Sequence, residues 1–143
     1  ACAPRRAPAA AAMCAPGGAA GGDGIEVVQR IGSGSFGEVF LVRRAGEPRS
    51  LVMKEIPSFA AMEPDQRKAT EQEVQLMKRI AHPNVVAYRD HFVKDSGHLC
   101  IFMEYCEHGD IHTYLQDARA GGRPSPGEGL VLEWLAQVAL ALQ

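Results

Sequence analysis

The chain has no long apolar run. No stretch of its 143 residues approaches the roughly 20 consecutive apolar residues that a transmembrane helix needs. Charge of one sign is also missing, because the formal net charge at pH 7 is only −2. This balance argues against a nucleic-acid-binding or membrane-binding surface, both of which need excess cations. The apolar fraction of 46% is ordinary for a globular protein, and the length suits one domain.

Cysteine is scarce. The four cysteines are Cys2, Cys14, Cys100 and Cys106, and their spacing matches neither a zinc ribbon nor a C-x-x-C redox pair. We therefore expect free thiols and a reducing, cytoplasmic location. Cys106, His108 and His112 are close in sequence, but they supply three ligands without a fourth, so we expect no metal site.

Residues 1–24 have no acidic residue before Asp23 and no period that would give an apolar face. They are mostly Ala, Gly and Pro. Such a segment cannot bury enough surface to offset the entropy of ordering it, so we expect a disordered leader. A targeting segment is the alternative, because Arg5, Arg6 and the many alanines resemble the acid-poor composition of a transit peptide.

Three glycines in a G-x-G-x-x-G run, Gly32, Gly34 and Gly37, carry the strongest chemical signal. They allow a backbone to lie against phosphate oxygens, and Lys54 downstream can neutralise those oxygens. Dinucleotide-binding folds use the same letters, but there the glycines open a helix. Here strand-like residues lie on both sides of the run, over 25–31 and 39–42, which favours a hairpin. Without an intervening helix, Glu55 is a poor candidate for a ribose-binding acid.

The remaining pattern predicts an alternation of strands and helices. Further strands are expected over residues 50–56, 85–92 and 98–105, and helices over 64–80, 111–119 and 130–143. In the last helix one set of apolar residues is expected to form a core face: Leu130, Trp134, Leu135, Val138 and Leu142.

Glu73 interrupts the apolar stripe of the helix over 64–80. At 100° per residue it shares that stripe with Ala69, Leu76, Met77 and Ile80. A carboxylate buried there without a partner would cost several kcal/mol. We therefore expect a buried or half-buried Glu73 paired with Lys54 on the adjacent strand. The alternative places Glu73 at the edge of the stripe, where it reaches water.

The order of these parts resembles the N-terminal lobe of a eukaryotic protein kinase, followed by the start of the C-lobe. The similarity covers residues 25–143, with an N-lobe over 25–105 and the hinge and incomplete C-lobe over 106–143. It implies an α+β fold: a five-stranded antiparallel sheet, one major helix and the first helices of a truncated helical lobe. The sequence looks most like that of NIMA-related serine/threonine kinases in three segments, Val52–Ile56, His82–Arg89 and Met103–Asp110.

The resemblance implies ATP as the ligand. Lys54 would hold the α- and β-phosphates, with Glu73 positioning it. Backbone N–H groups of the glycine run would cover the phosphates, main-chain groups of Glu104 and Cys106 would bind the adenine edge, and Asp110 would reach the ribose. Val52 stands where most kinases have alanine. The complete set of implied ATP-binding residues is Ile31, Gly32, Ser33, Gly34, Ser35, Phe36, Gly37, Val39, Val52, Lys54, Met103, Glu104, Cys106 and Asp110.

The sequence contains neither His-Arg-Asp nor Asp-Phe-Gly, the motifs that supply the proton acceptor and the Mg²⁺ ligands. We expect a piece of a longer kinase that transfers the ATP γ-phosphate to protein serine or threonine, with Mg²⁺ ligands in the missing C-lobe. The piece alone should be inactive. A pseudokinase or scaffold module, and a non-enzymatic fragment, remain as alternatives. Cytoskeletal or ciliary association is implied by the subfamily resemblance only.

Overall fold

The computed structural model describes residues 24–34 and 37–142. The predicted leader up to residue 23, Ser35 and Phe36 of the glycine run, and Gln143 lie outside the described residues. The described chain forms one five-stranded sheet in the order β1-β2-β3-β5-β4, with every neighbouring pair antiparallel. This arrangement confirms the predicted fold class. The strands are β1 (Ile25–Gly34), β2 (Gly37–Arg44), β3 (Leu51–Ile56), β4 (Tyr88–Val93) and β5 (Leu99–Glu104).

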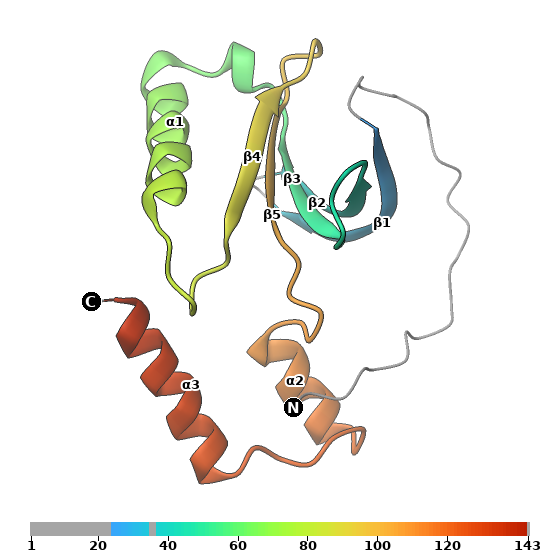
Figure 1. Cartoon of the computed structure of the whole chain (residues 1–143), viewed down its shortest axis with the longest axis vertical. Helices are drawn as coiled ribbons and strands as arrows, with labels where there is room; N and C mark the ends of the chain where they lie inside the picture. Colours follow the sequence, from blue (N-terminus) through green and yellow to red (C-terminus); the bar gives the residue numbers. More distant parts are fainter. Residues whose placement is uncertain (1–23, 35–36, 143) are drawn as a thin grey trace.

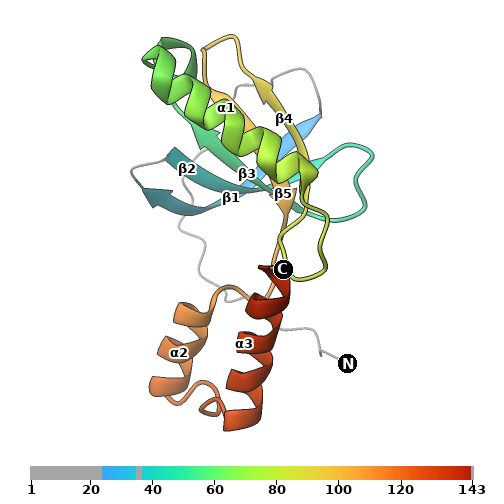
Figure 2. The same ribbon diagram turned by 90° about the vertical axis from the view of Figure 1, so that its left-hand side faces the viewer.

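One major helix packs on this sheet. Helix α1 (Pro64–Arg79) follows a short 3-10 turn, η1 (Phe59–Ala61), and lies against one face of the strands (Figure 1). Two further helices, α2 (Ile111–Arg119) and α3 (Glu128–Ala141), lie side by side beyond the end of β5 (Figures 1 and 2). Between them the Tyr114 and Trp134 rings meet edge to face with centroids 5.4 Å apart.

The two faces of the sheet carry separate apolar clusters, because successive side chains of a strand point to opposite sides. The helix face, covered by α1, buries Ile56, Phe59, Val74, Leu99 and Ile101. The opposite side, here called the outer face, buries Val42, Leu51, Met53, Cys100 and Phe102. Phe92 stacks on Phe102 with ring centroids 5.6 Å apart. The central strands β3 and β5 therefore contribute to both clusters.

Several predicted boundaries differ from the structure; for example, β1 extends to Gly34 and β2 begins at Gly37. Strand β4 begins at Tyr88 rather than at residue 85, because the chain still turns there and the Val85 N–H donates to the His82 carbonyl at 3.1 Å. Helix α3 begins at Glu128 rather than Leu130. An apolar pattern detects only the packed residues of a helix, whereas an acidic residue in the first turn is stabilised by the helix dipole.

The predicted apolar stripe of α1 is not the side that meets the sheet. Val74 is the buried residue, at 2% exposure, with Thr70 and Met77 half-buried at the adjoining turns. Leu76 is 59% exposed and Ile80 is 40% exposed. The contact side therefore follows residues 70, 74 and 77, one step around the helix from the predicted stripe. The prediction that Glu73 is buried or half-buried is wrong, because its side chain is 58% exposed.

The predicted core face of α3 is also not buried among the described residues. Leu135, Val138 and Leu142 are 61%, 56% and 82% exposed. Trp134, which packs on Tyr114, is half-buried. In the described part of the chain, the apolar side of α3 thus has little protein against it beyond the α2 contact.

Replacing Val74 by alanine tests which side of α1 holds the helix to the sheet. We expect Val74→Ala to lower the free energy of unfolding by about 1–3 kcal/mol, because it removes buried methyl groups and leaves a cavity. Leu76→Ala on the neighbouring side should change it by less than about 0.5 kcal/mol. Urea denaturation of both variants measures the difference. A larger loss in Leu76→Ala would contradict the observed helix orientation.

Candidate nucleotide-binding site

The glycine run joins two paired strands. Gly32, Ser33 and Gly34 at the end of β1 pair with Val39, Glu38 and Gly37 at the start of β2. The run is thus the tip of a β-hairpin, and no helix follows it. This geometry excludes the dinucleotide-binding alternative, in which the glycines must open a helix.

Gly37 is the glycine of the run at which the backbone cannot accept a side chain. Its φ of +114° lies in the region that side chains disfavour. A Cβ built there would stand 2.0 Å from the carbonyl oxygen of Glu55 and 3.3 Å from the Cα of Ile56. The start of β2 therefore lies in close contact with the backbone of β3. By contrast, a Cβ on Gly34 would meet nothing within 4 Å.

The predicted adenine-contacting residues lie together with Lys54 on the helix face. In the register, Val39 is paired with Lys54 and Val52 with Met103. Paired residues of antiparallel strands point to the same face, so Val39, Val52, Lys54 and Met103 share one side of three adjacent strands. Ile31 falls at a register shift between Arg30 and Gly32 and is 42% exposed. The result is an accessible apolar surface with one ammonium group at its edge.

Lys54 and Glu73 come together as predicted. The Lys54 Nζ atom lies 3.9 Å from Glu73 Oε1, and the two side chains are 26% and 58% exposed. At this distance and exposure, such a pair contributes only about 0–1 kcal/mol to stability. Its consequence is positional, because it orients the ammonium group on the helix face below the glycine hairpin.

The hinge after β5 offers a main-chain donor. The Glu104 N–H donates to the Ala87 carbonyl at 2.9 Å, and the Cys106 carbonyl accepts from the Gly109 N–H at 3.1 Å. We find no hydrogen bond from the Cys106 N–H to any described residue. Binding of an adenine edge by this donor stays a prediction.

Asp110 has a role that the sequence prediction did not assign. It is the N-cap of α2, and its Oδ1 accepts from the Thr113 N–H at 2.7 Å. This hydrogen bond holds the pKa of the Asp110 carboxyl below its usual value. The preference of Asp for N-caps was the available signal. A ribose contact from Asp110 stays a prediction.

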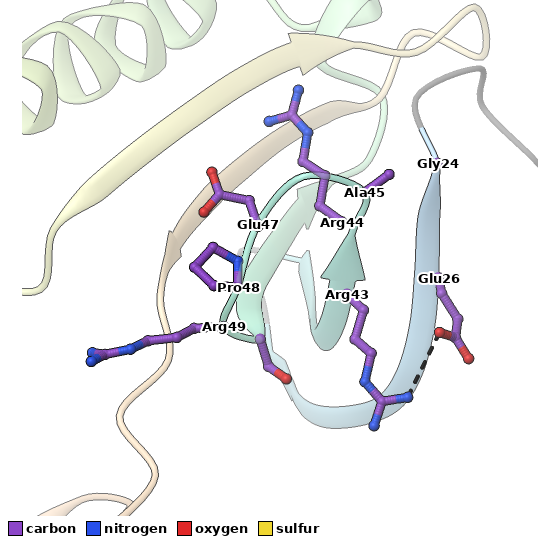
Figure 3. A pocket seen from close by; sticks show the side chains of 9 residues that line it. Gly24, Glu26, Arg43, Arg44, Ala45, Glu47, Pro48 and Arg49 are labelled. Atoms are coloured by element: carbon purple, nitrogen blue, oxygen red, sulfur yellow. Dashed lines mark ion pairs between the residues drawn. The ribbon is translucent and has the colours of Figure 1, made fainter.

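Neither of two surface cavities coincides with this site. One, of about 450 Å³, lies between α1 and β4, and the other, of about 370 Å³, lies at the β2–β3 turn. The second contains three arginines, but their side chains diverge: Arg43 points toward Glu26, whereas Arg49 points away (Figure 3). Arg44 pairs with Asp90 at 2.7 Å. Divergent cations do not converge on an anion.

The described residues also limit metal and thiol chemistry. Across 24–34 and 37–142, no three His, Cys, Asp or Glu side chains gather as a metal ion would require. Cys100 and Cys106 are free cysteines. Cys100 is buried in the outer-face cluster, and burial raises the pKa of its thiol to about 11. Cys106 is exposed at the hinge.

These features, a glycine hairpin next to a paired lysine and an apolar surface on the same face of the sheet, agree with a sequence comparison. Residues 25–143 match the family described as protein kinase domain. The chain therefore belongs to the protein kinase domain family.

The relatives are NEK kinases, in agreement with the predicted resemblance. Mouse serine/threonine-protein kinase Nek4 is 36% identical over 113 residues, covering 79% of this chain and 14% of Nek4. Mouse Nek1 is 36% identical over 116 residues, covering 81% of this chain and 9% of Nek1. Rice Nek6 is 37% identical over 117 residues, covering 82% of this chain and 21% of Nek6. The chain thus spans less than a quarter of each of these relatives.

Alanine substitutions separate the structural glycine from its neighbour. We expect Gly37→Ala to lower the free energy of unfolding by more than about 1 kcal/mol, because φ and the Glu55 carbonyl both oppose a side chain there. Gly34→Ala should change it by less than about 0.5 kcal/mol. Chemical denaturation of the two variants gives the comparison. Equal losses would contradict the close approach of β2 to β3.

Proposed function

We propose that this chain forms the ATP-binding part of a protein serine/threonine kinase, an enzyme that transfers the γ-phosphate of ATP to serine or threonine side chains of proteins. One observation carries the proposal. Lys54 lies on the helix face of the central strand β3, 3.9 Å from Glu73, below a hairpin of glycines.

The residues present fit ATP. A triphosphate needs a cation and N–H donors, which Lys54 and the backbone from Ser33 to Gly37 would provide. Adenine needs apolar surfaces and an edge donor, which would come from Val39, Val52 and the Cys106 N–H. Bound ATP would supply the transferable phosphoryl group, while Lys54 would hold the α- and β-phosphates in place. The protein contributes orientation and charge rather than a covalent step.

The Mg²⁺ that accompanies ATP in kinases finds no cluster of ligands among the described residues, so we derive no step through the metal. The sequence also lacks the His-Arg-Asp and Asp-Phe-Gly motifs. We propose that the 143-residue chain binds the nucleotide without transferring phosphate, and that transfer belongs to the longer protein. The retained Lys54–Glu73 pair favours an active kinase over a pseudokinase or scaffold.

The expected partner is a protein substrate in the cytoplasm. No helix within the described ranges is long and apolar enough to cross a membrane. The formal net charge of −2 supports a partner other than nucleic acid. Free Cys100 and Cys106 are consistent with a reducing compartment.

Lysine substitutions test ATP binding and phosphate transfer separately. In the 143-residue chain, Lys54→Met should weaken ATP binding by about tenfold or more, because a charge-assisted contact to the phosphates is lost. Lys68→Met, an exposed lysine of α1, is the control and should bind normally. Isothermal titration with ATP and MgCl₂ measures both.

The measurement of phosphate transfer uses the longer protein. There, Lys54→Met should abolish phosphate transfer from radiolabelled ATP to casein without changing the circular dichroism spectrum. Full transfer by that variant would contradict the assignment of Lys54. Nucleotide binding without any transfer by the unmodified longer protein would identify a pseudokinase.

A further inference from the structure

Glu55 holds the most shielded carboxylate in an ion pair among the described residues. Its side chain is 17% exposed, and its Oε1 lies 2.9 Å from Lys94 Nζ and 2.8 Å from His98 Nδ1. Because a carboxylate only accepts, His98 Nδ1 must carry the hydrogen in this contact. Burial raises the pKa of Glu55, but the hydrogen bonds from Lys94 and His98 outweigh burial and hold it below its usual value.

These two partners of Glu55 come from the turn that joins β4 and β5. Lys94 and His98 flank that turn, which the Lys94 N–H closes by donating to the His98 carbonyl at 2.8 Å. Glu55 alternates with Lys54 along β3, so it points to the outer face while Lys54 points to the helix face. The contact therefore links the β4–β5 turn to the strand that carries the proposed phosphate-binding lysine.

Glu55 also faces a second carboxylate. In the register of β2 and β3 it is paired with Glu38, the residue directly after Gly37. Like charges directly opposite each other on a sheet are destabilising unless cations compensate. Arg30 compensates Glu38 at 2.8 Å and Lys94 compensates Glu55 at 2.9 Å, while His98 adds a hydrogen bond to Glu55 at 2.8 Å. Three strands and the β4–β5 turn thus contribute to one row of charged and polar side chains: Arg30, Glu38, Glu55, Lys94 and His98.

The row lies beside the close contact between Gly37 of β2 and the backbone of β3. The missing Cβ of Gly37 would stand 2.0 Å from the Glu55 carbonyl oxygen. Repulsion between Glu38 and Glu55 would therefore act directly beside Gly37 and favour moving the start of β2 away from β3. Such a movement would separate the start of β2, and with it the glycine hairpin, from the strand that carries Lys54.

We propose that Glu55 is a positioning residue for the glycine hairpin, and that Lys94, which neutralises the Glu55 carboxylate opposite Glu38, and His98, which hydrogen-bonds it, keep the hairpin close to Lys54. The proposal rests on the proposed function, because the distance between the hairpin and β3 is relevant only if nucleotide phosphates bind at the hairpin. It assigns the β4–β5 turn a direct influence on the site from the opposite side of the sheet.

The test compares variants of the 143-residue chain. Lys94→Met removes the principal cation, and Lys94→Arg restores it. The double variant Lys94→Met with Glu38→Gln removes the opposing carboxylate as well, and Glu38→Gln alone serves as its reference. Asp90→Asn is the matched control, because it breaks another partly buried ion pair of the same sheet, Arg44–Asp90 at 2.7 Å.

Three measurements are made on each variant. Hydrogen–deuterium exchange of residues 32–39 without nucleotide reports how tightly the hairpin is held. Titration with ATP and MgCl₂ reports affinity, and urea denaturation reports global stability. We expect Lys94→Met to speed the exchange and weaken ATP binding by about fivefold or more. Lys94→Arg and the double variant should return both values toward the unmodified chain. Asp90→Asn should lower stability without altering either.

The outcomes separate the two proposals. A Lys94→Met variant with unchanged exchange and affinity would overturn the positioning role, as would equal effects in Asp90→Asn. Failure of the Glu38→Gln change to rescue Lys94→Met would also overturn it, because a lost packing contact is not restored by removing a second charge. If the unmodified chain binds no ATP, the proposed function fails, and the exchange data alone decide whether Glu55 holds the hairpin. Should Lys94→Met not fold, Lys94→Gln replaces it in the same comparison.

Discussion

The geometry of the candidate site depends on the close contact between the paired strands β2 and β3. The backbone of Gly37 passes over the carbonyl of Glu55 with no room for a Cβ. That approach fixes the glycine hairpin above the central strand, and the strict alternation of β3 then places Lys54 on one face and Glu55 on the other. Apolar residues on both faces keep β3 in the middle of the sheet, so neither side chain can exchange places with the other.

The three glycines of the run are equivalent in the sequence pattern, but the fold constrains each of them differently. Gly37 combines a positive φ with a backbone contact, whereas Gly34 lies in open space and Gly32 would meet Val39 at an ordinary contact distance. A pattern of glycines therefore indicates a phosphate-binding loop without saying which glycine the fold requires. The register of β2 against β3 supplies that information.

The sequence predicted the strands, the hairpin and the Lys54–Glu73 pair from alternation, turn residues and charge, and the resemblance to protein kinases implied the five-stranded sheet. It did not predict which side of α1 meets the sheet. Two neighbouring arcs of the helix, one through Glu73 and Leu76 and one through Thr70 and Val74, both contain apolar residues and share Met77. Periodicity alone gives them similar weight, and only the shape of the sheet decides for Val74. The Glu55 contacts were missed for a related reason, since Lys94 and His98 reach Glu55 through strand pairing that no local pattern encodes.

The burial of Cys100 has a consequence for how the molecule can be observed. Thiol-modifying reagents attack the thiolate, and a thiol with a pKa of about 11 in a closed apolar cluster presents almost none at neutral pH. Cys106, exposed at the hinge, is open to the same reagents in the folded chain. The rate at which Cys100 becomes labelled therefore measures how often the outer-face cluster around it opens to solvent.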